Sequence, residues 1–130
     1  MPRLFTLKEA LAILPDVREL VVRARKQGRD YADAERQLAS AVATVRGNGH
    51  SGRALREAQE RMARSSGKFQ RTIQDLESLG CEIKDLEMGL VDFRSSRDGR
   101  EVYLCWRLGE DTIAYWHELD AGFTGRQPLG

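Results

Sequence analysis

The dipeptide Asp98-Gly99 places the strongest constraint on how this chain can fold. Runs of alternating apolar and polar residues flank it on both sides, and Asp-Gly between such runs is typical of a two-residue β-hairpin turn. Pairing about this turn sets Phe93 opposite Leu104. It likewise sets Val91 opposite Trp106.

This pairing sorts the side chains of both strands into two faces, because successive residues of a strand point to opposite sides. One face is apolar and consists of Val91, Phe93, Val102, Leu104 and Trp106. The other face consists of Asp92, Arg94, Tyr103, Cys105 and Arg107, whose polar groups can pair with one another or bind an anion; we favour pairing. We expect the apolar face to pack against the core.

A third strand is predicted after a turn at residues 108–111. With a two-residue loop of Gly109 and Glu110, His117 lies on the core face, together with Ile113 and Tyr115. Trp116 then lies beside Tyr103 and Cys105. A shift of one residue reverses these assignments, and the sequence leaves both registers open.

The segments on either side of these strands carry weaker signals. Residues 81–84 can form a short extended segment. The tail from Asp120 to Arg126 is rich in turn residues, and we expect it to fold back over the sheet with Phe123 as its anchor. The prediction for this half of the chain is therefore a three-stranded antiparallel meander.

The N-terminal half is predicted to be helical. Residues 6–9, Thr-Leu-Lys-Glu, form a capping box in which Thr6 and Glu9 each satisfy a free backbone N–H, so a helix should begin there. Pro15 disfavours helical geometry at Leu14 and suits the first turn of a new helix. We expect a break or kink near Leu14, followed by a long helix from about Pro15.

Apolar or small residues recur along this long helix in steps of three and four, at Val17, Val21, Ala24, Gly28, Tyr31, Leu38, Val42 and Val45, with Glu35 filling one position. The glycine-rich segment Gly47–Gly52 should end it. A second helix, from about Gly52 to Leu79, carries the matching stripe of Leu55, Ala58, Met62, Ser65, Phe69, Ile73, Leu76 and Leu79. Gly80 is its expected left-handed stop.

Together these patterns predict one α+β domain over residues 1–130. A long antiparallel helical hairpin occupies residues 1–80, and the meander with its C-terminal tail occupies residues 81–130. Because such a long apolar seam is hard to cover with two helices, we also expect a homodimer formed by helix packing, for example as a four-helix bundle.

Charge is unevenly distributed although the whole chain carries a net charge of only +1. Residues 16–74 hold thirteen Lys/Arg and seven Asp/Glu, whereas residues 75–130 hold six and twelve. The asymmetry can mark a nucleic-acid surface, two ends that attract each other in a dimer, or ordinary solvated helix faces, and we favour the last. The arginines that would contact phosphates are Arg18, Arg25, Arg29, Arg36, Arg53, Arg56, Arg64 and Arg71, but no nucleic-acid motif or interleaved aromatic accompanies them.

Compartment is indicated by the cysteines and by hydropathy. Cys81 and Cys105 stand far apart in unlike contexts, so we expect reduced, partly buried thiols and no disulfide. The sequence has no signal-peptide pattern and no apolar run approaching about 18 residues. We expect a soluble cytoplasmic protein with no membrane partner.

Candidate chemistry centres on His117, which has Glu118 and Asp120 nearby. A histidine with carboxylates can hold Zn²⁺, Mn²⁺ or Fe²⁺, but at strand spacing His117 and Glu118 point to opposite faces. A metal site would need Asp92, Asp85 or a second chain to complete it. We favour a structural role in which His117 bonds a carboxylate such as Asp120.

Cys105 is a second candidate, as a nucleophile with His117 as its base. It stands in the middle of a strand, with no helix N-terminus to lower its pKa, so we favour a buried structural thiol. The sequence therefore predicts no catalytic residue and no cofactor. The candidate ligand or partner site consists of Asp92, Tyr103, Arg107, Trp116, His117, Asp120 and Arg126.

Three motifs carry a resemblance to a known family. They are Gly89-Leu-Val-Asp-Phe93, Cys105-Trp-Arg-Leu-Gly-Glu110 and the segment from Trp116 to Leu129, to which the opening Phe5-Thr-Leu-Lys-Glu-Ala10 adds weaker support. On these residues the chain resembles the bacterial domain-of-unknown-function family 2203 over nearly its whole length. The resemblance implies a small cytoplasmic bacterial protein without an established activity, so no catalytic residue carries over.

The sequence favours a structural or interaction module that self-associates through its helical hairpin and presents the Trp116-His117 end to an unknown protein partner. The alternative is a small-molecule or metal-binding protein, and thus a possible enzyme, with its site near Trp116, His117 and Asp120. Non-specific nucleic-acid binding by the basic hairpin is the weaker alternative.

Overall fold

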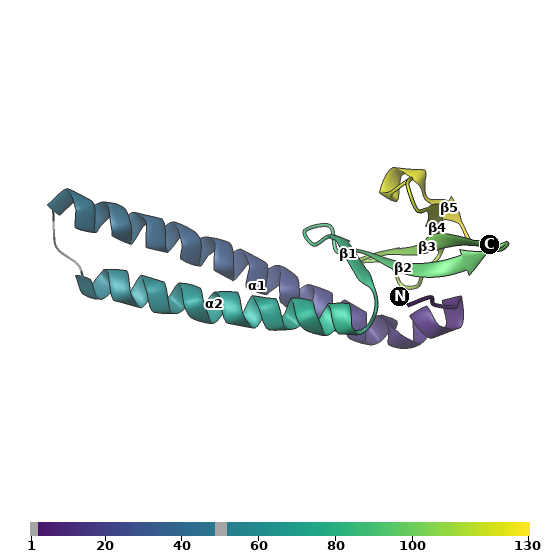
Figure 1. The fold of residues 1–130 in the computed structure, drawn as a ribbon, viewed down its shortest axis with the longest axis horizontal. Helices are drawn as coiled ribbons and strands as arrows, with labels where there is room; N and C mark the ends of the chain where they lie inside the picture. The colour runs from purple at the N-terminus through teal and green to yellow at the C-terminus, as the bar shows by residue number, and fades with distance from the viewer. Residues whose placement is uncertain (1–2, 49–51) are drawn as a thin grey trace. The chain divides into compact units, whose positions relative to one another are not determined.

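The computed structural model describes residues 3–48 and 52–130, and in it two helices precede an antiparallel sheet (Figure 1). The elements are α1 (Leu7–Asn48), α2 (Gly52–Ser78), β1 (Glu82–Asp85), β2 (Leu90–Arg97), β3 (Arg100–Arg107), β4 (Tyr115–Glu118), the 3₁₀ helix η1 (Phe123–Gly125) and β5 (Gln127–Pro128). The α+β class is confirmed, but the sheet has five strands where three were predicted. No described helix is long and apolar enough to cross a membrane.

The start of α1 is the predicted capping box. The backbone N–H of Thr6 donates to Glu9 Oε1 at 2.8 Å, and that of Glu9 donates to Thr6 Oγ1 at 3.1 Å. The predicted break near Leu14 is wrong, because α1 continues through Pro15. Pro15 has no N–H for the ladder, but buried side chains on both sides of it, Ala10, Leu14, Val17 and Val21, pack the helix along one face.

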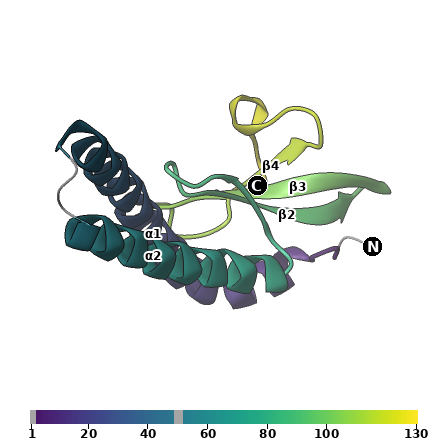
Figure 2. The same ribbon diagram turned by 60° about the vertical axis from the view of Figure 1, so that its left-hand side comes forward.

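The chain divides into two compact units. The hairpin unit spans residues 23–73, where α1 and α2 run side by side and antiparallel (Figures 1 and 2). Tyr31 and Phe69 meet across it with ring centroids 6.3 Å apart. Ala34 is buried in place of the exposed Glu35, a local deviation from the predicted stripe. Gly47 and Asn48 still belong to α1, and the remainder of the predicted loop, residues 49–51, lies outside the described residues.

The sheet unit comprises residues 1–22 and 74–130. Its strands lie in sequence order, and β2 pairs with β3 in the predicted register, with Phe93 opposite Leu104. Asp98 and Gly99 adopt φ values of 53° and 81°, as a type I′ turn requires. The apolar face is buried as expected, and Phe5 packs edge-on against Phe93 at 5.4 Å.

The two additional strands lie at the edges of the sheet and are short. β1 has four residues, and its pairing with β2 shifts between Ile83 and Asp85. β5 has two residues, one of them Pro128. Neither is long enough to show the alternation by which strands are recognised, so only the extended segment at residues 81–84 was anticipated.

The connection from β3 to β4 differs from the prediction. It covers residues 108–114, not two residues, and Trp106 Nε1 donates to the Glu110 carbonyl within it at 2.9 Å. In the resulting register Tyr103 pairs with His117 and Leu104 with Trp116. His117 therefore lies on the polar face and Trp116 on the core face. Of the two registers that the sequence left open, the one with the two-residue loop, which sets Trp116 beside Tyr103 and Cys105, is wrong, and the alternative is the one formed.

The β1–β2 turn generates a stability prediction at Gly89. This residue has φ +66°, and an added Cβ would lie 2.4 Å from Leu108 Cβ. Gly99 also has positive φ, 81°, but its Cβ would meet nothing within 4 Å. Gly99→Ala should cost about 1–2 kcal/mol for the left-handed backbone. Gly89→Ala should cost roughly 1–3 kcal/mol more from overpacking. Urea unfolding of both variants measures the two losses of unfolding free energy. Equal losses would show that the close approach of Gly89 to Leu108 does not matter for stability.

Candidate functional site

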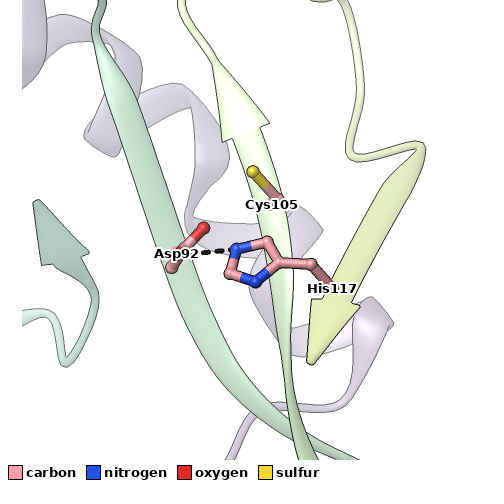
Figure 3. A group of neighbouring side chains, drawn as sticks. All are labelled: Asp92, Cys105 and His117. Atoms are coloured by element: carbon pink, nitrogen blue, oxygen red, sulfur yellow. Dashed lines mark hydrogen bonds and ion pairs between the residues drawn. The ribbon is translucent and has the colours of Figure 1, made fainter. Parts of the chain in front are cut away.

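Asp92, Cys105 and His117 form a buried cluster on the polar face of the sheet (Figure 3). They come from the neighbouring strands β2, β3 and β4, and the pairing of these strands brings them together. Asp92, Cys105 and His117 are 1%, 0% and 2% exposed, respectively. Each residue contributes one possible ligand atom: a carboxylate oxygen from Asp92, the sulfur of Cys105 and a ring nitrogen of His117. These three atoms lie within 4.8 Å of one another.

The histidine is held at both ring nitrogens. Its Nδ1 lies 2.7 Å from the backbone carbonyl of Glu118, and its Nε2 lies 3.0 Å from Asp92 Oδ2. A carbonyl oxygen can only accept a hydrogen bond, so Nδ1 carries a proton and donates it. The Nε2 atom is thereby left facing the carboxylate in the centre of the cluster.

The carboxylate of Asp92 is only partly satisfied. Its Oδ2 meets His117, whereas Oδ1 is buried without a hydrogen-bond partner among the described residues. Burial raises the pKa of Asp92 above its usual value, although the charge of the adjacent His117 opposes that rise. A buried oxygen without a partner is costly, and such a group calls for an explanation.

The thiol of Cys105 is a poor nucleophile in this environment. Burial, together with the nearby Asp92 carboxylate, raises the pKa of Cys105 to about 12. Because the thiolate is the reactive form, the expectation of a buried thiol fits this site better than the Cys105–His117 catalytic pair. Cys81 is also free and buried, and burial raises its pKa to about 11.

A small cavity of about 130 Å³ reaches the cluster. Asp92 and His117 line it together with Lys84, Leu90, Tyr103, Leu119, Gly122 and Phe123. The tail therefore does fold over this face, with the half-buried Phe123 as part of the wall. Tyr103 stacks at a tilt on His117, with ring centroids 5.4 Å apart. Its hydroxyl donates to Glu82 at 2.9 Å and accepts from Arg94 at 2.9 Å.

Three of the seven predicted site residues meet in this place: Asp92, Tyr103 and His117. Trp116 lies on the other face, where Arg97 stacks 4.7 Å from its ring centroid. The predicted hydrogen bond between His117 and a carboxylate is present, but its partner is Asp92 and not Asp120, which is exposed in a turn.

The two predicted arginines and the alternative ligand Asp85 also lie outside the cluster. Arg107 is exposed beside the Phe123 ring. Arg126 donates to both carboxylate oxygens of Glu110, at 2.8 and 2.7 Å, and stacks on the Tyr115 ring. Asp85 is exposed and accepts a hydrogen bond from the backbone of Met88.

Sequence reasoning considered Cys105 only as a nucleophile beside His117 and left it out of the ligand site, and it missed the wall residue Lys84 and the Glu110–Arg126 pair. For Cys105 a signal existed, because the predicted hairpin register already set it opposite Asp92 on one face. For the Glu110–Arg126 pair there was no local signal, since 16 residues separate its members.

The cluster offers one nitrogen, one oxygen and one sulfur donor, which are the donor types found in transition-metal sites. Asp92, Cys105 and His117 are the described residues that can hold a metal ion together. Besides metal binding, the site can accept hydrogen bonds from a small guest at Asp92 Oδ1.

In a comparison with protein families, residues 3–129 match the family DUF2203, which is described as an uncharacterized conserved protein. No curated protein and no solved structure matches the chain.

The raised thiol pKa values lead to a reactivity prediction. At about pH 8 both thiols should be almost fully protonated in the folded, chelator-treated protein, and Ellman's reagent should react with them slowly. Unfolding in urea should make both thiols react rapidly with the reagent. The Cys81→Ser variant isolates Cys105; its rapid reaction in the native state would restore Cys105 as a candidate nucleophile.

Proposed function

The chain belongs to the uncharacterised family DUF2203, and from the geometry of its own residues we propose that it is a ligand-binding protein whose site is the cluster of Asp92, Cys105 and His117. The observation that carries the proposal is the buried Asp92 Oδ1, which has no hydrogen-bond partner among the described residues. A guest that is positively charged or that donates hydrogen bonds would satisfy this oxygen.

The surroundings of the cluster support binding over a purely structural role. A buried polar group normally acquires its partners from the protein, and a half-satisfied network is less stable than an apolar core. Here Asp92, the residue with the unsatisfied oxygen, lines a cavity of about 130 Å³, which is room for a few non-hydrogen atoms. A structural His117–Asp92 pair alone would not need that cavity.

Native mass spectrometry of protein purified without chelator tests this proposal. Wild type should carry an additional mass, and Asp92→Asn and His117→Asn should lose it. Both replacements are close to the original in shape, and Asn at 117 can still donate to the Glu118 carbonyl. Asp120→Asn, in the exposed turn, is the matched control and should keep the mass. A folded wild type without additional mass under all purification conditions would contradict the proposal.

Self-association through the hairpin unit is the second candidate function, and it is the interaction module expected from the sequence. Within the described part of residues 23–73 only Ala24, Ala34, Ala58 and Thr72 are buried. The larger seam residues, among them Leu38, Val42 and Phe69, remain partly exposed. Two helices cover each apolar stripe from one side only, so a second copy packed on the seam would bury these side chains.

Nucleic-acid binding receives less support. The hairpin unit has twelve Lys/Arg and five Asp/Glu, a net charge of +7. Its two aromatic residues, Tyr31 and Phe69, pack against each other in the seam, which leaves no ring for stacking on bases. The same charge opposes hairpin packing between copies, and salt should screen that repulsion.

The dimer prediction is tested by gel filtration with light scattering at micromolar concentration. Wild type should be a dimer, and raising the salt concentration should strengthen it. Val42→Glu, in the half-exposed seam, should give a monomer that remains helical by circular dichroism. Ala43→Glu makes the same change on the exposed face and should leave the dimer intact. A wild-type monomer, or a dimer that salt dissociates, would overturn hairpin packing.

A further inference from the structure

The donor atoms of the cluster identify the class of its ligand. Resting on the ligand-binding function proposed above, we infer that the protein binds a divalent transition-metal ion of the zinc type, through the Asp92 carboxylate, Cys105 Sγ and His117 Nε2. The three donors come from three adjacent strands, so the sheet itself holds them in place.

The donor types select among the metals. Thiolate and imidazole ligands favour Zn²⁺ and similar transition metals, whereas Mg²⁺ and Ca²⁺ require mostly oxygen ligands, six or more for Ca²⁺. The cluster has a single carboxylate beside one sulfur and one imidazole nitrogen. A hard cation would find too few oxygens here, and a zinc-type ion would find three suitable ligands.

The distances are close to those that a tetrahedral ion requires. With bonds of about 2.0–2.3 Å, the donors of a zinc site stand roughly 3.3–3.6 Å apart. Asp92 Oδ2 and His117 Nε2 are 3.0 Å apart, and one donor atom from each of the three residues lies within 4.8 Å of the other two. Side-chain movements of about 1 Å or less would therefore assemble the site, without a change of strand register.

The histidine already has the orientation that metal-binding histidines need. Its Nδ1 donates to the Glu118 carbonyl at 2.7 Å, which fixes the ring and directs Nε2 toward the cluster. Such an outer hydrogen bond is the usual partner of a metal-bound imidazole. In the metal-free protein a proton must lie between Nε2 and Asp92 Oδ2, because two lone pairs would otherwise face each other at 3.0 Å. The ion would take the place of that proton, which would leave to solvent.

Charge is balanced in the same arrangement. The carboxylate and the thiolate together carry two negative charges, which a divalent ion neutralises in the buried site. The Cys105 thiol gives up its proton to solvent when the Zn–S bond forms. Three protein ligands leave one position of a tetrahedral ion for water or a small molecule, and the cavity beside Asp92 and His117 provides the access.

Titration of the metal-free protein with Co²⁺ tests this inference. Wild type should bind one ion per chain, with a thiolate-to-cobalt charge-transfer band and the intense visible bands of a tetrahedral ion. Cys105→Ser should lose the charge-transfer band. Cys81→Ser, which alters the other buried thiol, is the matched control and should retain it.

Competition with Zn²⁺ extends the test to the other two ligands. Asp92→Asn and His117→Asn should each weaken Zn²⁺ binding by more than the roughly 10–100-fold that is typical when a hydrogen-bond partner of a metal ligand is lost. Circular dichroism checks that each variant is folded. Absence of Co²⁺ and Zn²⁺ binding by wild type, or a charge-transfer band that survives in Cys105→Ser, would overturn the metal inference.

The outcomes separate this inference from the broader proposal. If wild type binds neither ion but carries an organic mass that Asp92→Asn removes, the metal inference fails and ligand binding stands. If neither a metal nor an organic mass is found, both fail.

Discussion

The pairing of β2 with β3 is the constraint on which the rest of the sheet unit depends. Eight residue pairs, from Leu90–Arg107 to Arg97–Arg100, follow from the turn at Asp98-Gly99. They determine that Val91, Phe93 and Trp106 lie on one face and Asp92 and Cys105 on the other, since side chains alternate along a strand. A shift of one residue would carry a carboxylate into the apolar core, where its burial would cost several kcal/mol.

The polar face has an energetic cost that the fold tolerates. Asp92 and His117 are almost fully buried, and their hydrogen bond offsets only part of the cost of burying them. Oδ1 of Asp92 has no hydrogen-bond partner among the described residues. Burial of ionisable groups more often lowers stability than raises it. In the rest of the sheet, the sequence pattern agrees with the fold. A buried, partly unsatisfied polar pair in such a fold is expected at a functional site, and this is the physical reason for assigning function to Asp92 and His117.

In the helices, the local sequence pattern predicted some features correctly, and tertiary packing overrode it at others. The seam of residues 23–73 was recognised because apolar residues recur every three or four positions, and this periodicity depends only on neighbours along the chain. Its fully buried residues are small, and its large ones are partly exposed. The break predicted at Leu14 failed for the opposite reason, because the local effect of Pro15 was outweighed by the packing of the buried residues around it.

Local sequence patterns were enough to predict the helix start at Thr6, the hairpin turn, the β2–β3 register and the separation of an apolar from a polar face. Each of these follows from residues close together in the chain. Tertiary packing was needed to establish the register of β4, the edge strands and the residues that surround His117. The loop at residues 108–114 has no sequence signal for its length, and that length selects which face His117 occupies. Asp92 and His117 are 25 residues apart, and their contact depends on two successive strand pairings, the second of which no local pattern specifies.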